Sequence, residues 1–455
     1  MTIANRASAS YSSAYIAHSA FRVGYVDILR VLAAVIVLNN TFAKATFDER
    51  TNSMPLDTPQ GIFRDASWAI TLLFMISGRV VTAVALPPSS SAENFKPNYP
   101  ALVSSMFRRA FRFALPVIIV AFTQWQLCKK GHTAKASASA QEIFLGSTTM
   151  APAPAGWCSI GGFSGLITFI VDLFTFNGPA AAEKMGSMLW TVTWFMEGSY
   201  AVYLTAFLTA QLASNRYVVF ATLMAFSWVT YSWNWVFLLG YVICDMKAHG
   251  HFHRPRNSFV AIALQILSLV LAFGIKWVLP LRDFLNNTFA HLQIDIASNN
   301  LVHFADTLSV FFLLTFFELA PTVQSILSFR IFKHIGHLAA GIYLLHPLYL
   351  YTVIPQIAGH LRSSNFSRIV GICWLALVVL STVTAFFFYQ LIEKQSVAAG
   401  IYAWRWLAHP AGIIDGYIPG DKVKPDKYKV ITETDNGRGK RPEMDVMTVG
   451  PATTA

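Results

Sequence analysis

The stretch 24–42, GYVDILRVLAAVIVLNNTF, decides the fold, because it runs almost without polar side chains for the length of a bilayer crossing. The composition outside it has the same character: 55% of the 455 residues are hydrophobic and 13% are charged, with a mean hydropathy of +0.48. A soluble protein needs far more charged surface than this. The sequence therefore predicts an all-α, polytopic integral membrane protein with about ten transmembrane helices, at 25–46, 66–86, 110–127, 188–210, 216–230, 232–246, 257–279, 303–322, 334–355 and 367–392.

The loops between these runs favour ten crossings with both termini in the cytoplasm. In that topology the inner loops hold more Lys and Arg than the longer outer loops. The glycosylation sequons at Asn286 and Asn365 then lie outside, and so do Cys128 and Cys158, for which a disulfide is possible in an oxidising compartment. The apolar run 161–176 is either an eleventh span or an interfacial helix. We expect a multi-pass protein of the plasma membrane or an endomembrane.

Three parts are expected along the chain. Residues 1–24 form a cytoplasmic N-terminal segment, 25–395 form the transmembrane domain with a long extracytoplasmic loop at 128–187, and 404–455 form a polar, lysine-rich tail that reads as disordered. The net charge of +11 lies in loops and tail, which fits attraction to anionic lipid. The lipid bilayer is thus the expected partner, and no nucleic-acid motif is present.

Polar residues within or at the ends of the apolar runs are the first candidates for function, because charge inside a membrane is costly. Asp27 and Arg30 are three residues apart and can pair, either as a simple salt bridge at a helix end or as part of a site. Thr41 follows Arg30 by eleven residues, about 16 Å up the same face. The cluster Arg108, Arg109 and Arg112 can bind phosphates by forked hydrogen bonds, or can anchor the helix as inner-surface positive charge.

Two further residues stand deeper in apolar runs. Glu197 has no evident partner in its own helix, so it is either protonated or paired with another helix. His346 lies in mid-membrane, where it is either hydrogen-bonded to a neighbouring helix or active in chemistry.

Together these segments resemble the membrane-bound acyltransferase 3 family, most of all its fungal members. The resemblance spans about 22–395 and rests on the order of D-x-x-R, F-x-x-S-G, R-R-x-x-R, W-T and G-x-x-x-x-x-x-Y-L-x-H along the chain. It implies transfer of an acyl group, often acetyl, from acyl-CoA to a hydroxyl of a sugar, lipid or other small molecule, with no metal. The matching positions are Asp27, Arg30, Ser77, Gly78, Arg109, Arg112, Trp190, Thr191, Gly198, Ser199, Tyr343 and His346.

The sequence departs from the family pattern at two places. The family carries a histidine, its presumed general base, where this chain has Thr41, and a hydroxyl cannot take up a proton at neutral pH as an imidazole can. Glu197 stands where fungal members have a basic residue, and Phe195 where they have a glutamate.

The expected function is therefore a membrane O-acyltransferase, in the first instance of acetyl groups, with acyl-CoA as co-substrate. In it Arg30, Arg108, Arg109 and Arg112 bind the donor, His346 or Glu197 serves as base, Asp27 and Thr41 belong to the site, and Trp190 or an arginine stabilises the oxyanion. The alternative is a catalytically inactive relative that acts as a small-molecule or lipid transporter or as a non-enzymatic partner.

Overall fold

The computed structural model describes residues 24–46, 59–81, 99–136, 160–175, 188–209, 215–230, 232–249, 258–292, 304–361 and 363–408, with 158, 212 and 252. No strand occurs in these ranges. The main helices are α2 (Gly24–Thr46), α3 (Ala66–Val81), α4 (Tyr99–Lys129), α6 (Gly162–Phe174), α8 (Trp190–Thr209), α9 (Arg216–Val229), α10 (Asn234–Ala248), α11 (Ser258–Trp277), α12 (Leu279–Ala290), α13 (Phe304–Leu319), α14 (Pro321–Leu327), α15 (Arg330–Gly336), α16 (Ala339–Leu350), α17 (Ile354–His360), α18 (Phe366–Phe388) and α19 (Lys394–Ala408).

Helix α2 lies at the centre of the bundle and packs on α3, α15 and α16. Its apolar run has Asp27 in the first turn and Lys44 in the last, the placement that the helix dipole favours. Most of its side chains are buried, including Tyr25, Leu29 and Ile36. The apolar stretch 24–42 thus forms an internal helix, which places its polar residues inside the bundle.

Glycines bring α3 and α10 into close contact. A Cβ at Gly78 would lie 2.0 Å from the Phe237 carbonyl oxygen, and one at Gly240 would lie 2.0 Å from the Met75 carbonyl oxygen. Only residues without a side chain let two backbones approach this closely. Ser77 and Gly78, two positions of the sequence pattern, therefore lie at a close helix–helix contact.

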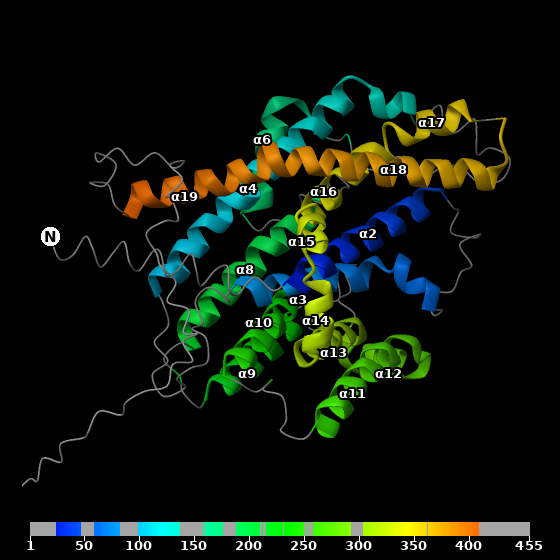
Figure 1. Cartoon of the computed structure of the whole chain (residues 1–455). Helices are drawn as coiled ribbons and strands as arrows, with labels where there is room; N and C mark the ends of the chain where they lie inside the picture. The colour runs from blue at the N-terminus through cyan, green and yellow to red at the C-terminus, as the bar shows by residue number, and fades with distance from the viewer. Residues whose placement is uncertain are drawn as a thin grey trace, which may run out of the picture. The chain divides into compact units, whose positions relative to one another are not determined.

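Helix α18 continues through a π-helical turn, η3 (Tyr389–Glu393), into α19, so that 366–408 forms one long helical segment (Figure 1). α19 packs along α4 (Figure 1), with the rings of Trp404 and Phe107 5.5 Å apart. The tail predicted to begin at 404 therefore begins too early: helix continues to Ala408, because aromatic packing on α4 holds its last turn. Residues 409–455 lie outside the described ranges, as do 1–23 and most of the loop 128–187.

Two of the expected continuous spans are broken. The run 303–322 bends by 93° where α13 gives way to α14, because Pro321 removes a helical N–H donor. The run 334–355 is divided among α15, α16 and α17, with turns at His337–Leu338 and Tyr351–Val353. Helix α12 is an additional element that the apolar runs do not predict, and it carries Asn286.

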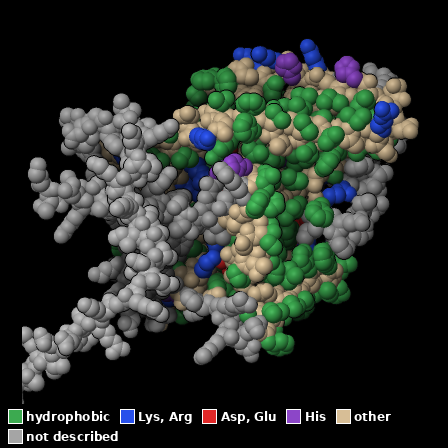
Figure 2. Space-filling view, in the orientation of Figure 1, with side chains coloured by type: hydrophobic (Ala, Val, Ile, Leu, Met, Phe, Trp, Pro, Cys, Tyr) green, Lys and Arg blue, Asp and Glu red, His purple; other side chains and the backbone are tan. Residues whose placement is uncertain are grey.

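Exposed apolar side chains on the outside of the bundle indicate that its surroundings are lipid. On α11, Phe259 is 76% exposed and Val270 is 59% exposed. Similar residues continue on α4, α9 and α18, and hydrophobic side chains cover much of the face in Figure 2. A soluble monomer rarely exposes apolar surface so continuously. The chain is an α-helical protein of membrane type.

Fewer than ten helices in the described ranges have by themselves the length and apolarity of a bilayer crossing. In the described ranges, four helical segments qualify, Gly24–Thr46, Ala101–Lys129, Phe259–Trp277 and Phe366–Ala408, and the bent pair α13 and α14 makes a fifth. Several other predicted spans form helices of 12 to 16 residues, namely α3, α9, α10 and α16. Helix α6 has 13 residues, which reach about 20 Å and fall short of a hydrocarbon core of about 30 Å.

Candidate functional site

Arg109 is the centre of a polar cluster between α3, α4 and α8. Its Nε donates to Ser199 Oγ at 2.8 Å, and a terminal guanidinium nitrogen donates to Ser77 Oγ. Arg30 and Arg112 lie close enough for their charges to act on Arg109. Spacing explains part of this, because Arg109 and Arg112 are one turn apart on α4. The cluster unites five of the positions predicted from the sequence.

The remaining predicted members of the inner cluster lie at its edge. Arg108 turns back to its own helix, where Nε donates to the Ser104 carbonyl at 3.1 Å. Arg30 pairs with Asp27 at 3.4 Å, as their spacing predicts. The structure therefore brings Arg30, Arg109 and Arg112 together but orients Arg108 differently.

The charge of Arg109 is poorly balanced by its surroundings. Its hydrogen bonds go to neutral hydroxyls, and its guanidinium lies 5.0 Å from the centre of the Phe113 ring, a cation–π contact. Within the described ranges no carboxylate forms an ion pair with it. Glu393 acts instead on the charge of Arg112. A sheltered guanidinium that contacts only hydroxyls and a ring can receive an anion.

A second polar contact joins α8 to α16. Tyr343 donates its hydroxyl proton to Thr191 Oγ1 at 3.0 Å, and its oxygen lies 3.8 Å from Met188 Sδ. Trp190, one residue earlier, is half-buried against the main hydrophobic core. Thr191 and Tyr343 are separate pieces of the sequence pattern, and the fold places them in direct contact.

The third contact joins α2 to α16 and involves Thr41 and His346. Thr41 Oγ1 lies 2.9 Å from His346 Nε2. The other ring nitrogen, Nδ1, lies 3.0 Å from the Ile342 carbonyl oxygen. His346 is fully buried and sits one turn after Tyr343, so one face of α16 presents both side chains to the bundle.

Glu197 lies apart from this arrangement. Its carboxylate accepts a hydrogen bond from Asn234 Nδ2 at 2.8 Å and another from Ser232 Oγ at 3.4 Å. Of the two readings from the sequence, contact with another helix is the one observed, and its partners are neutral side chains. Its hydrogen bonds lead toward α10, whereas those of His346 lead toward α2.

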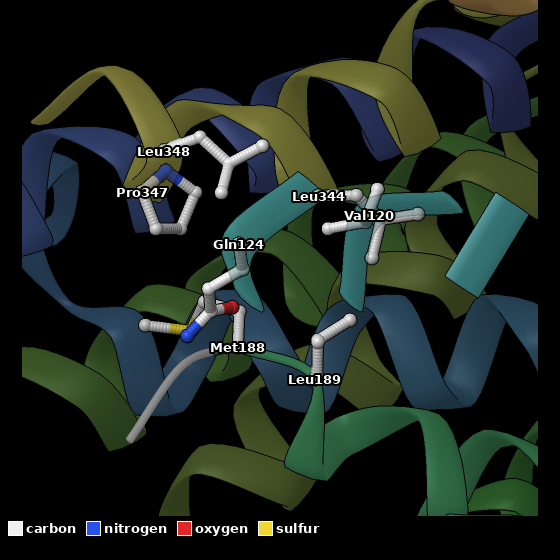
Figure 3. Close-up of a pocket in the computed structure, with 7 residues that line it drawn as sticks. All are labelled: Val120, Gln124, Met188, Leu189, Leu344, Pro347 and Leu348. Atoms are coloured by element: carbon white, nitrogen blue, oxygen red, sulfur yellow. The ribbon is translucent and has the colours of Figure 1, made fainter. Parts of the chain in front are cut away.

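A shallow recess lies between α4, α16 and the start of α8 (Figure 3). It encloses no space large enough for a water molecule, so in this conformation it is not a ligand pocket. Its lining is mostly apolar, with the amide of Gln124 as the polar exception: Val120, Gln124, Met188, Leu189, Leu344, Pro347 and Leu348. A large substrate would require these helices to separate.

Two buried ion networks are centred on residues that lie outside the sequence motifs. Glu318 on α13 accepts from Arg79 Nε at 2.5 Å, from the Tyr25 hydroxyl at 2.6 Å and from Lys247 Nζ at 2.6 Å. Arg79 therefore pairs inside the bundle, although its position allowed it to reach the membrane surface instead. The signal for Glu318 is present in the sequence, as an acidic residue inside an apolar run.

The other network is centred on Lys276, at the end of α11. Its Nζ lies 2.6 Å from Asp306 Oδ1 on α13 and also contacts Asp65, which precedes α3. Helices α3 and α13 thus contribute to an ion network at each of their ends. Buried charges of this kind are stable only when they are paired.

Cys128 and Cys158 form a disulfide with a Cα–Cα distance of 5.4 Å. The two sequons differ in environment. Asn365 is exposed at the start of α18, whereas Asn286 is half-buried in α12 and its carboxamide oxygen accepts from the Ala305 N–H at 3.0 Å. In the described ranges no group of three or more metal-ligating side chains is found.

The geometry therefore gathers the sequence pattern into three contacts, of which one is a basic cluster and one pairs a hydroxyl with an imidazole. Such an arrangement can bind a phosphate-bearing ligand at one place and can move a proton at another. Comparisons of the chain with models of protein families, with curated proteins and with solved structures give no match.

Proposed function

We propose that the protein is a membrane O-acyltransferase of the acyltransferase 3 type that moves an acyl group, in the first instance acetyl, from acyl-CoA to a hydroxyl of a small molecule, sugar or lipid. The observation that carries the proposal is the position of Arg109. Its guanidinium is held by Ser77 and Ser199, and its hydrogen bonds leave its charge available to an anion. CoA phosphates are anions of the right kind for a cluster of arginines.

The spacing of the polar contacts supports a donor path along α2. Arg30 contributes charge near Arg109, and Thr41 stands eleven residues later, about 16 Å along the helix. A donor whose phosphates bind near Arg30 would extend its thioester toward Thr41 and His346. In the reaction an acceptor oxygen bonds to the acyl carbon, the carbon–sulfur bond breaks, and the acceptor proton ends on the CoA thiol.

A topology of ten crossings with both termini inside is part of the proposal. The two ion networks support it, because their members fall at helix ends that this topology assigns to one side. All four members of the Glu318 network fall at predicted inner ends, and Asp65, Lys276 and Asp306 all fall at predicted outer ends. The disulfide belongs to a predicted outer loop, and disulfides persist in oxidising compartments.

The test is calorimetric titration of the full chain in lipid nanodiscs with acetyl-CoA, which needs no knowledge of the acceptor. Arg109→Ala/Arg112→Ala should lose most of the binding. The matched control, Arg282→Ala/Arg368→Ala, removes the same charge from predicted outer helix ends and should bind as the wild type does. Absence of saturable binding to folded wild-type protein, also with longer acyl-CoAs, would overturn the proposal and leave transport or a non-enzymatic partnership as the function to test.

A further inference from the structure

The protonation pattern of His346 follows from its two contacts. A carbonyl oxygen can only accept, so the nitrogen 3.0 Å from the Ile342 carbonyl, Nδ1, must carry a proton. In the neutral ring Nε2 then holds the lone pair. The group that Nε2 faces, at 2.9 Å, is the Thr41 hydroxyl. The basic nitrogen of the imidazole is therefore directed at a hydroxyl of the protein itself.

The Thr41 hydroxyl has one proton and three acceptors within reach. Its oxygen lies 2.7 Å from the Val37 carbonyl and 3.1 Å from the Leu38 carbonyl, both about one turn back in α2, and 2.9 Å from His346 Nε2. Rotation about the Cβ–Oγ1 bond moves the proton from one acceptor to another. A hydroxyl hydrogen-bonded to an imidazole whose second nitrogen is fixed by another acceptor is the arrangement that activates serine and threonine nucleophiles.

Burial determines which of the two groups a substrate meets. Thr41 is 8% exposed, whereas His346 is 0% exposed. An acceptor hydroxyl that needs His346 as its base would have to displace Thr41 from Nε2. A thioester that reaches Thr41 meets a hydroxyl already in contact with its base.

From this geometry we infer that Thr41 is itself the first acceptor of the acyl group, so that the reaction proceeds in two steps through an acyl-threonine. The inference rests on the proposed function and deepens it. In the first step Thr41 Oγ1 bonds to the acyl carbon, its proton passes to His346 Nε2, the carbon–sulfur bond breaks, and the proton leaves with the CoA thiol. In the second step an acceptor hydroxyl gives its proton to Nε2 and attacks the ester, and Thr41 regains a proton as it departs.

This assignment gives a role to the residue that departs from the family pattern. Threonine cannot replace histidine as a base, but it can accept an acyl group when a histidine lies beside it. Thr46, near the end of the same helix, offers a comparison. Its hydroxyl also bonds the carbonyl one turn back, that of Phe42 at 2.7 Å, and it is likewise buried. Among the described residues its hydroxyl has no hydrogen bond to a histidine, so it is a matched control.

The experiment incubates the full chain in nanodiscs with radiolabelled acetyl-CoA and no acceptor, then measures protein-bound label and locates it by peptide mass. We expect one acetyl group on Thr41, retained in Thr41→Ser and in Thr46→Val, and reduced to background in Thr41→Val. His346→Gln should slow labelling by about 10²- to 10⁴-fold, the usual contribution of a general base. Retained acetyl-CoA binding shows that each variant is folded.

Three results would overturn the inference, and they are distinguishable. If acetyl-CoA binds and turns over equally in wild type and Thr41→Val, with no label on Thr41, the acyl group passes directly to its acceptor and the acyltransferase proposal survives. If label appears on Thr46 or elsewhere but not on Thr41, the nucleophile is misassigned. If wild-type protein does not bind acetyl-CoA, both the inference and the proposed function fail.

Discussion

Replacement of Glu318 by glutamine tests whether the buried ion network stabilises the bundle. The carboxylate is fully buried and contacts Arg79, whose side chain is 3% exposed, and Lys247, whose side chain is 39% exposed. Glutamine keeps the shape and one acceptor oxygen, so the change removes charge with little change of volume. Lys247 can turn its ammonium group toward solvent, but Arg79 cannot. The variant therefore leaves one buried cation without compensation.

The expected loss in the free energy of unfolding is about 3–5 kcal/mol, the cost of removing one partner from a buried pair. The assay is unfolding of the purified protein in mixed micelles with increasing denaturing detergent, followed by helical circular dichroism. Asp283→Asn is the matched control, because Asp283 pairs with Arg282 at 3.3 Å but its side chain is 58% exposed. The control should lose at most about 1 kcal/mol. Equal, small losses in the two variants would refute the reasoning.

Three further predictions concern packing, the disulfide and the sequons. Gly78→Ala should lower the unfolding free energy, because its Cβ would meet a backbone oxygen at 2.0 Å. The loss should exceed roughly 1 kcal/mol, the amount by which helices favour alanine over glycine. Gly274→Ala has open space around it and should be neutral or stabilising in the same unfolding assay. Replacing both disulfide cysteines with serine should cost about 3–4 kcal/mol for a closed loop with a sequence separation of 30, measured as the difference in unfolding free energy between the wild type and the variant. Asn365→Gln should remove a glycan and increase gel mobility, while Asn286→Gln should change mobility little, because Asn286 is engaged with the Ala305 N–H; the opposite pattern would contradict the assignment.

Much of the helical architecture is predictable from the sequence, because apolar runs are the strongest signal in a membrane protein. All ten predicted runs are largely helical where they are described, and α2 agrees with its predicted bounds within one residue. The breaks are harder to foresee. Pro321 gives a local reason for one of them, but the division of 334–355 depends on how its pieces pack against α2 and α18. The sequence contains ten apolar runs. In the described part of the chain, four helices, or five with the bent pair, are long and apolar enough to cross a bilayer.

The sequence predicts which residues belong to the candidate site better than it predicts which of them touch. Arg109, Thr41 and His346 are found from sequence, but nothing in their spacing indicates that Thr41 and His346 touch across 305 positions of the chain. Glu318 and Lys276 are missing from the motif pattern, because each gains its partners only when distant helices meet. Long-range pairing of polar residues is set by tertiary packing, and a single sequence contains no direct record of it.

The central claim is that an acyl-CoA lies between the arginine cluster and the Thr41–His346 pair. Cryo-electron microscopy of the protein in nanodiscs with saturating acetyl-CoA tests it most directly. We expect density for phosphate groups beside Arg109 and Arg112 and density for the pantetheine arm running along α2 toward Thr41. An unliganded Arg109 cluster under these conditions, or a nucleotide bound elsewhere on the protein, would contradict it.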